Sequence, residues 1–254
     1  FMGFQSGYNN TSYLQNTMIG TMVGYNNEEG YNTFIGHHAG YESGETESAV
    51  LIGHYAGYNA NSEHGIAIGN YAGYGMASES LLVIGHTSND YGGIPGYELT
   101  SESLASTIIG CGAGSALVSG DINTFVGTGA GANTITGSYN TFVGGLAGYN
   151  NSISGTTQKH GFLNTYIGYK AGYTPELGGY NTGMGYNADV DTTAISYAIF
   201  LGANALVKGN GATAVGYESQ VKNEYAIGIG NESSVNGTYS LGIGYQVNID
   251  SSSN

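Results

Sequence analysis

Histidine and cysteine side chains recur at one position of a repeating pattern in the first half of the chain. His37, His54 and His86 each directly follow a glycine, Asn70 holds the equivalent position between them, and Cys111 comes next. Equivalent side chains of stacked repeats come close enough to share a metal ion such as zinc. No carboxylate accompanies them to support such ligands, so a solvent-facing polar row is the favoured interpretation, and we expect neither a metal nor a cofactor.

Asparagine–threonine pairs form a second recurring group. An aligned threonine row could order water, which makes ice binding one candidate function. The competing interpretation is that the two side chains bond backbone groups at each corner of the chain, and it is favoured because no flat Thr-x-Thr face is maintained. The asparagines of these pairs are Asn16, Asn32, Asn123, Asn140, Asn164 and Asn181.

Other catalytic or binding patterns are weak. The glycine-dense stretch from Gly127 to Gly131 lacks the lysine and following helix of a phosphate-binding loop. No nucleophile-elbow sequence occurs, so we predict that the chain is not an enzyme. Asp189 and Asp191 could bind calcium weakly, although a solvated turn is the favoured interpretation.

Charge and composition exclude several classes of partner. The chain carries a formal net charge of −14, with four lysines and no arginine, which disfavours contact with nucleic-acid phosphates. No apolar run approaches the roughly 20 residues that span a bilayer. Among the 254 residues, 46 are glycine and 23 are tyrosine, which indicates many tight turns in a chain too apolar for disorder.

An aliphatic residue followed directly by glycine recurs fifteen times. These glycines must form the corners that position the recurring histidine and asparagine side chains. Most intervals are 16 or 17 residues, the last three are 14, and two are 24 or 25. The glycines are Gly3, Gly20, Gly36, Gly53, Gly69, Gly85, Gly110, Gly127, Gly144, Gly168, Gly185, Gly202, Gly216, Gly230 and Gly244.

The two residues before each glycine form two apolar rows. Adjacent residues of a strand point to opposite faces, so one row should fill the core and the other should meet partner chains. A wide coil that turns both rows inward is the alternative. The row predicted as core contains Ile35, Ile52, Ile68, Ile84, Val126, Val143 and Ile167. The row predicted as oligomer interface contains Phe34, Phe125, Phe142, Tyr166 and Phe200.

The period predicts an all-β fold, a parallel β-solenoid of about fifteen coils with two brief strands in each. Stacking at about 4.8 Å gives a rod of roughly 70 Å. We divide it into residues 1–209, with long repeats and two insertions, and residues 210–254, with 14-residue repeats. Five residues after the glycine, tyrosines such as Tyr41 give way to valines such as Val207, which we interpret as one packing position.

The repeats resemble those of a known family. The segments "ATAVGYESQVKN", "YAIGIGNESSVNG" and "YSLGIGYQVN" are similar to the 14-residue repeats of YadA-like heads in trimeric autotransporter adhesins. The segments "NTFIGHHAGY", "NTFVGGLAGY" and "NTYIGYKAGY" resemble the longer repeats of related bacterial surface and phage tail-fibre proteins. The resemblance implies a left-handed β-roll, three chains in each fibre, an extracellular location on a cell surface or phage tail, and attachment to a receptor.

The two long intervals hold insertions that leave the regular rod, around residues 89–103 and 150–162. Protruding loops often carry recognition, so Tyr91, Tyr97, Lys159 and His160 are our candidate contacts for a surface receptor, glycan or protein. Lateral packing between chains is the alternative role for these loops.

Together these patterns predict a homotrimeric fibre segment that attaches by multivalent display. The first alternative is a homopolymeric structural filament, because the chain opens inside a repeat at Phe1 and ends without an apolar cap, as expected for a piece of a longer assembly. An ice-binding solenoid is the second alternative.

Overall fold

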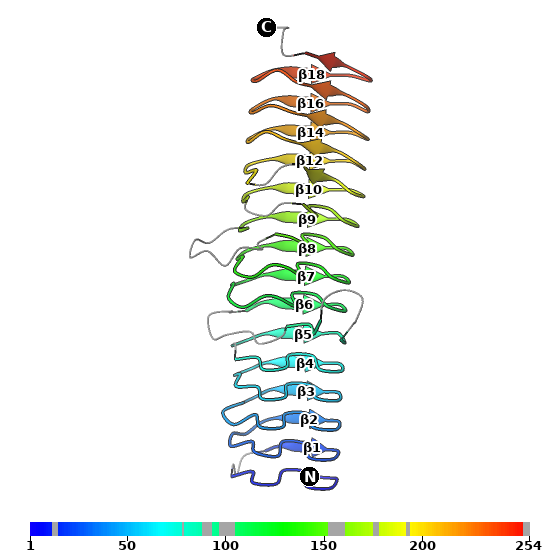
Figure 1. Cartoon of the computed structure of the whole chain (residues 1–254). Coiled ribbons are helices and arrows are strands. Elements are labelled where there is room, and N and C mark those ends of the chain that lie inside the picture. Colours follow the sequence, from blue (N-terminus) through cyan, green and yellow to red (C-terminus); the bar gives the residue numbers. More distant parts are fainter. Residues whose placement is uncertain are drawn as a thin grey trace.

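The chain folds as a β-solenoid, as predicted. The structure is a computed structural model, and it describes residues 1–11, 15–77, 79–87, 93–96, 105–151, 161–174, 178–191 and 194–250. The described residues form strands, turns and bends without a helix. The coils stack into one elongated rod with the two termini at opposite ends (Figure 1).

One long parallel sheet runs through the rod, with one three-residue strand in each coil. Its strand order follows the chain, and an isolated bridge between Met2 and Ile19 adds one further coil before the first strand. The strands are β1 (Thr17–Ile19), β2 (Thr33–Ile35), β3 (Val50–Ile52), β4 (Ile66–Ile68), β5 (Leu82–Ile84), β6 (Thr107–Ile109), β7 (Thr124–Val126), β8 (Thr141–Val143), β9 (Thr165–Ile167), β10 (Thr182–Met184), β12 (Ile199–Leu201), β14 (Thr213–Val215), β16 (Ile227–Ile229) and β18 (Leu241–Ile243).

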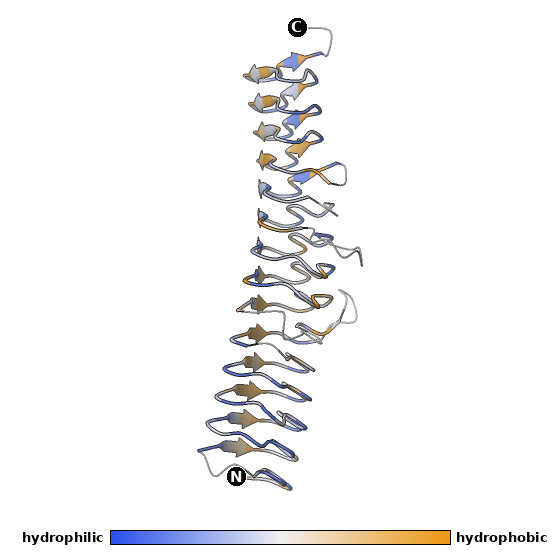
Figure 2. Cartoon of the chain, turned by 90° about the vertical axis from the view of Figure 1, so that its left-hand side faces the viewer, coloured by the Kyte–Doolittle hydropathy of each residue, from blue (hydrophilic) through white to orange (hydrophobic). Residues whose placement is uncertain are grey.

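A second sheet exists only in the C-terminal coils, where a second column of strands stands beside the first (Figure 2). Its strands are β11 (Asp189–Val190), β13 (Leu206–Val207), β15 (Gln220–Val221), β17 (Ser234–Val235) and β19 (Asn248–Ile249). The expectation of two strands in every coil was therefore wrong for the described earlier coils, where turns replace the second strand.

The two apolar rows do face opposite ways, but their sides are the reverse of the prediction. The middle residue of each strand points inward and its neighbours point outward. Five residues predicted for an oligomer interface are fully buried inside the single chain: Phe34, Phe125, Phe142, Tyr166 and Phe200. The row predicted as core lies on the outer face, half-buried or exposed: Ile35, Ile52, Ile68, Ile84, Val126, Val143 and Ile167.

The interior of the long coils explains this reversal, because the middle residue of each strand fills it, and in several coils that residue is a large aromatic side chain. The rings of Phe125 and Phe142 stack with centroids 5.0 Å apart, and Tyr166 follows 5.1 Å beyond Phe142. Gly183 then leaves room for the Phe200 ring, because a Cβ at Gly183 would overlap that ring. Aliphatic side chains occupy the same buried row in the other long coils: Met18, Leu51, Ala67, Val83 and Ile108.

In the last three coils the second sheet meets small inner residues. Ala214, Gly228 and Gly242 hold the inner position of the long sheet there. A Cβ on Gly228 would meet the side chains of Val221 and Val235. The second sheet therefore packs directly on the first, and a 14-residue coil closes around this narrower core.

Tyrosine and valine do not share one packing position, contrary to our interpretation. Tyr25, Tyr41 and Tyr58 stack on the surface at 5.0 and 5.3 Å, whereas Val190 and Val207 are buried. In the long coils the preceding glycine turns the chain with a left-handed φ, such as 59° at Gly40. Where another residue replaces that glycine, the chain continues as a strand and the next side chain points inward.

Buried asparagines join each coil to the next, which confirms the corner interpretation for their side chains. Asn140 Oδ1 accepts from the Asn164 N–H at 3.0 Å, and Asn140 Nδ2 donates to the Gly161 carbonyl at 2.7 Å. Asn123 and Asn181 make equivalent bonds. The threonines that follow these asparagines begin the strands and point outward instead.

The repeat glycine marks the closest approach between neighbouring coils. Gly127 has a φ of 139°, and a Cβ there would lie far inside contact distance of the carbonyl oxygen of Gly144 in the next coil. The same clash recurs at equivalent glycines along the rod. Both the backbone angle and the available space therefore require glycine.

We expect Gly127→Ala to lower the free energy of unfolding by more than about 3 kcal/mol, because strain and overlap act together. Gly44→Ala is the matched control, since a Cβ there meets nothing within 4 Å. That control should be neutral or stabilising by up to about 1 kcal/mol. Urea unfolding followed by circular dichroism measures both, and equal stabilities would contradict the account.

Candidate functional site

The four candidate receptor contacts in the insertions, Tyr91, Tyr97, Lys159 and His160, lie outside the described residues. Their role stays a prediction.

The histidine row is shorter than the sequence indicated. The rings of His37 and His54 stack at 5.2 Å, but His54 Nδ1 meets the Asn70 side chain at 3.1 Å, and His86 Nδ1 turns to the Thr87 carbonyl at 2.8 Å. Among the described residues no three histidine, cysteine or acidic side chains could hold a metal ion. Both rings of the stacked pair are exposed at the surface.

His38 belongs to the same cluster, although the sequence did not single it out. Its ring lies 4.0 Å from that of His37, and its Nε2 lies 3.0 Å from the sulfur of Met22. Partial burial, and then the nearby charges of His37 and His54, lower the pKa of His38. A lowered pKa keeps this ring neutral inside an aromatic patch near physiological pH.

The first and third residues of each strand form two parallel rows of side chains on the outer face of the long sheet, and no described strand packs over this face. The first residues of the strands are eight threonines and six aliphatic residues: Thr17, Thr33, Val50, Ile66, Leu82, Thr107, Thr124, Thr141, Thr165, Thr182, Ile199, Thr213, Ile227 and Leu241. The third residues are all aliphatic: Ile19, Ile35, Ile52, Ile68, Ile84, Ile109, Val126, Val143, Ile167, Met184, Leu201, Val215, Ile229 and Ile243.

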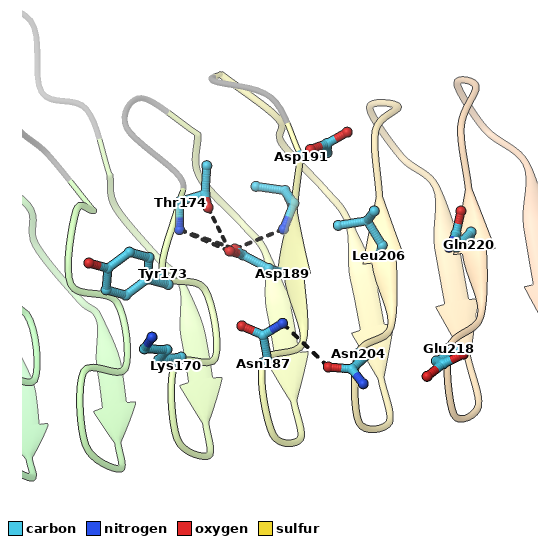
Figure 3. A pocket seen from close by; sticks show the side chains of 11 residues that line it. Lys170, Tyr173, Thr174, Asn187, Asp189, Asp191, Asn204, Leu206, Glu218 and Gln220 are labelled. Carbon is cyan, nitrogen blue, oxygen red and sulfur yellow. Dashed lines mark hydrogen bonds between the residues drawn. The ribbon is translucent and has the colours of Figure 1, made fainter.

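A groove lies where the long coils give way to the thinner ones, at the start of the second sheet. Its hollow has a volume of about 500 Å³ and crosses four successive coils (Figure 3). The lining residues are Lys170, Tyr173, Thr174, Asn187, Asp189, Val190, Asp191, Asn204, Leu206, Glu218 and Gln220. Polar side chains dominate this set, in contrast to the sheet face.

Asp189 fixes the inner wall of the groove. Its side chain is 8% exposed and accepts hydrogen bonds from the Thr174 N–H at 3.1 Å, the Thr174 hydroxyl at 2.7 Å and the Val190 N–H at 2.9 Å. Burial raises the pKa of the Asp189 carboxyl to about 6, although the hydrogen bonds from Thr174 and Val190 act to lower it. Asp191 pairs with Lys208. Both aspartates therefore have partners within the chain.

The outer rim of the groove is one corner position repeated in four coils. Lys170, Asn187, Asn204 and Glu218 have left-handed φ angles of 56°, 51°, 55° and 53°. Because the four corners share one left-handed φ, their side chains project from the same position in successive coils. Asn187 Nδ2 donates to Asn204 Oδ1 at 3.3 Å, and the Lys170 ammonium lies 5.4 Å from the centroid of the Tyr173 ring.

Sequence reasoning missed this groove, although a signal was available. Asp189 stands where the preceding long coils carry glycine, at Gly148 and Gly172. A charged residue at a position that is otherwise a left-handed turn marks a change in coil shape. The predicted change of repeat length at residue 210 lies about one coil further along the chain.

Comparisons with protein-family models, with curated proteins and with solved structures found no match for this chain. No helix suited to crossing a membrane occurs in the described part of the chain. The fold and the surfaces described above therefore carry the functional argument.

We expect the stability of the chain to report on Asp189 between pH 4 and pH 6. Because the pKa of Asp189 is raised to about 6 in the fold, the folded state binds this proton more tightly than the unfolded chain. The stabilising contribution of this carboxyl to the free energy of unfolding is fully present below about pH 4. It is lost as the pH rises through 6, and the free energy of unfolding falls by about 2 to 3 kcal/mol.

Asp189→Asn removes this fall, so its stability relative to the wild type should rise over that pH range. Asp191→Asn removes only the smallest contribution to the raised pKa of Asp189, so it should keep most of the fall. Denaturant unfolding at steps of pH measures all three proteins. An unchanged pH dependence in Asp189→Asn would contradict the assigned environment.

Proposed function

We propose that this chain is a segment of an extracellular fibre, in which three copies pack through the outer face of the long sheet and display their remaining surfaces for attachment. The outward aliphatic row carries this proposal. The number three, the location on a cell surface or phage tail and the attachment role rest on the resemblance of the repeats to YadA-like heads.

The size of the outer face supports contact with other chains. Fourteen strands at about 4.8 Å spacing and three residues in width give a face of about 60 by 10 Å, or roughly 600 Å². The aliphatic row runs the length of this face beside a row that contains eight threonines, and exposed apolar surface of this kind often marks a contact with other proteins. Val143 is 36% exposed and Met184 47% exposed in the single chain. Burial of this row against other copies would remove that surface from water.

The chemistry of the two rows supports a protein contact over ice binding. The row of first residues contains eight threonines, which could order water. The row of third residues contains no hydroxyl in any of the fourteen strands. A dry contact between chains uses both kinds of row, because threonine methyl groups pack beside isoleucine and valine.

Light scattering should give the purified chain a mass of about three times its 26.2 kDa. Val143→Glu places a charge in the middle of the outer face and should reduce that mass to a single chain, because a carboxylate cannot be buried there without a partner. The variant should stay folded on its own, since residue 143 is already exposed within one chain.

Val118→Glu is the matched control, because Val118 is 46% exposed and lies outside the strands of the long sheet. It should keep the wild-type mass. A single-chain mass for the wild type would overturn the assembly, and ice-crystal growth in its presence would then test the ice-binding alternative. Continuous growth into filaments would favour the homopolymer.

A further inference from the structure

We propose that the groove beside Asp189 binds a neutral oligosaccharide, with Asn187, Asn204 and Tyr173 as its main contacts. The inference deepens the proposed function and rests on it, because an attachment fibre needs a ligand on a side surface. The groove opens beside the second sheet and uses no residue of the outward rows of the long sheet. It stays accessible when those rows are covered.

The shape of the groove fits a short chain-like ligand. Its rim residues lie in four successive coils, so Lys170 and Glu218 are separated by about 15 Å along the rod. The hollow of about 500 Å³ lies within the usual size of small-molecule sites. A ligand of several linked units, laid along the rod, would contact one rim side chain in each coil.

The two rim amides offer the hydrogen bonds that sugar hydroxyls need. The bond from Asn187 Nδ2 to Asn204 Oδ1 fixes both side chains (Figure 3). Asn187 Oδ1 and Asn204 Nδ2 have no partner among the described residues. One acceptor and one donor thus lie side by side, and neighbouring hydroxyls both donate and accept.

Tyr173 supplies an aromatic surface at one end of the groove. Its ring stacks on that of Tyr149 at 5.2 Å, and the stack ends there because the next coil places the buried Val190 at the equivalent position. An aromatic ring at the edge of a polar groove packs against the C–H face of a sugar ring. Lys170 stands beside this ring and donates to a hydroxyl.

Charge and lining disfavour other ligand classes. Asp191 is paired with Lys208, and Asp189 is buried against Thr174, so Lys170 and Glu218 leave the open rim close to neutral. The net charge of −14 repels polyanions. A peptide would need apolar pockets for its side chains, but among the described lining residues Leu206, which is half-buried, is the one large aliphatic side chain that is not fully buried.

Saturation-transfer NMR of the full chain with neutral tetrasaccharides of glucose, galactose, mannose or N-acetylglucosamine tests the proposal. At least one should bind. Asn187→Gly combined with Asn204→Gly should weaken it at least tenfold, and so should Tyr173→Ala. Glycine keeps the left-handed corner while removing the amide.

Gln246→Gly is the matched control, because Gln246 holds the same corner with a φ of 53° and also bonds one side chain in the neighbouring coil, Glu232. It should bind like the wild type. Absence of binding by every tetrasaccharide, or equal binding by the double glycine variant, would overturn the proposal.

Light scattering on the same samples separates this result from the proposed assembly. Tetrasaccharide binding by a single-chain protein would support the proposed groove site and contradict the proposed trimer. A trimer that binds no tetrasaccharide would contradict the proposed binding site and leave the proposed assembly standing.

Discussion

The stack depends on a close approach between backbones at the repeat glycine. At each such corner the carbonyl oxygen of one glycine lies where a side chain of the glycine in the preceding coil would otherwise be, and φ values near 135° hold the chain in a region open to glycine. Since the coils meet at this contact, the strands beside it pair in register. In-register pairing then aligns every other row, from the stacked Phe125 and Phe142 inside to the isoleucines and valines outside.

The residue four positions after the repeat glycine distinguishes the two shapes of coil. Where it is a second glycine, it turns the chain with a left-handed φ and leaves a tyrosine near the surface, as at Gly40 and Tyr41. Where it is another residue, as at Asp189, the chain continues as a strand of the second sheet, and valines such as Val190 and Val207 fill the core. The groove beside Asp189 arises where these two cross-sections meet. One change in core packing therefore produces a polar hollow in an otherwise regular surface.

Much of the fold could be predicted from the sequence, because the glycine interval and the paired apolar rows are strong signals of stacked parallel coils. The direction in which each apolar row faces could not be predicted. Alternation shows that Phe142 and Val143 face opposite ways, but both are apolar, and only the width of the coil decides which one is buried. The groove was missed because its residues are ordinary surface types, and only the departure from glycine at Asp189 distinguishes them. The asparagine corners were predicted correctly, since buried amides at regular intervals have few other uses.

The central claim is that the aliphatic face of the long sheet is an interface between copies of this chain. Single-particle electron cryomicroscopy of the purified protein tests it most directly, because stacked coils and neighbouring rods are both resolved in such a map. The account predicts three parallel rods with the rows of Thr141 and Val143 turned toward the common axis and the Asp189 grooves turned outward. Separate single rods, or assemblies joined through another surface with the long sheet facing solvent, would contradict it.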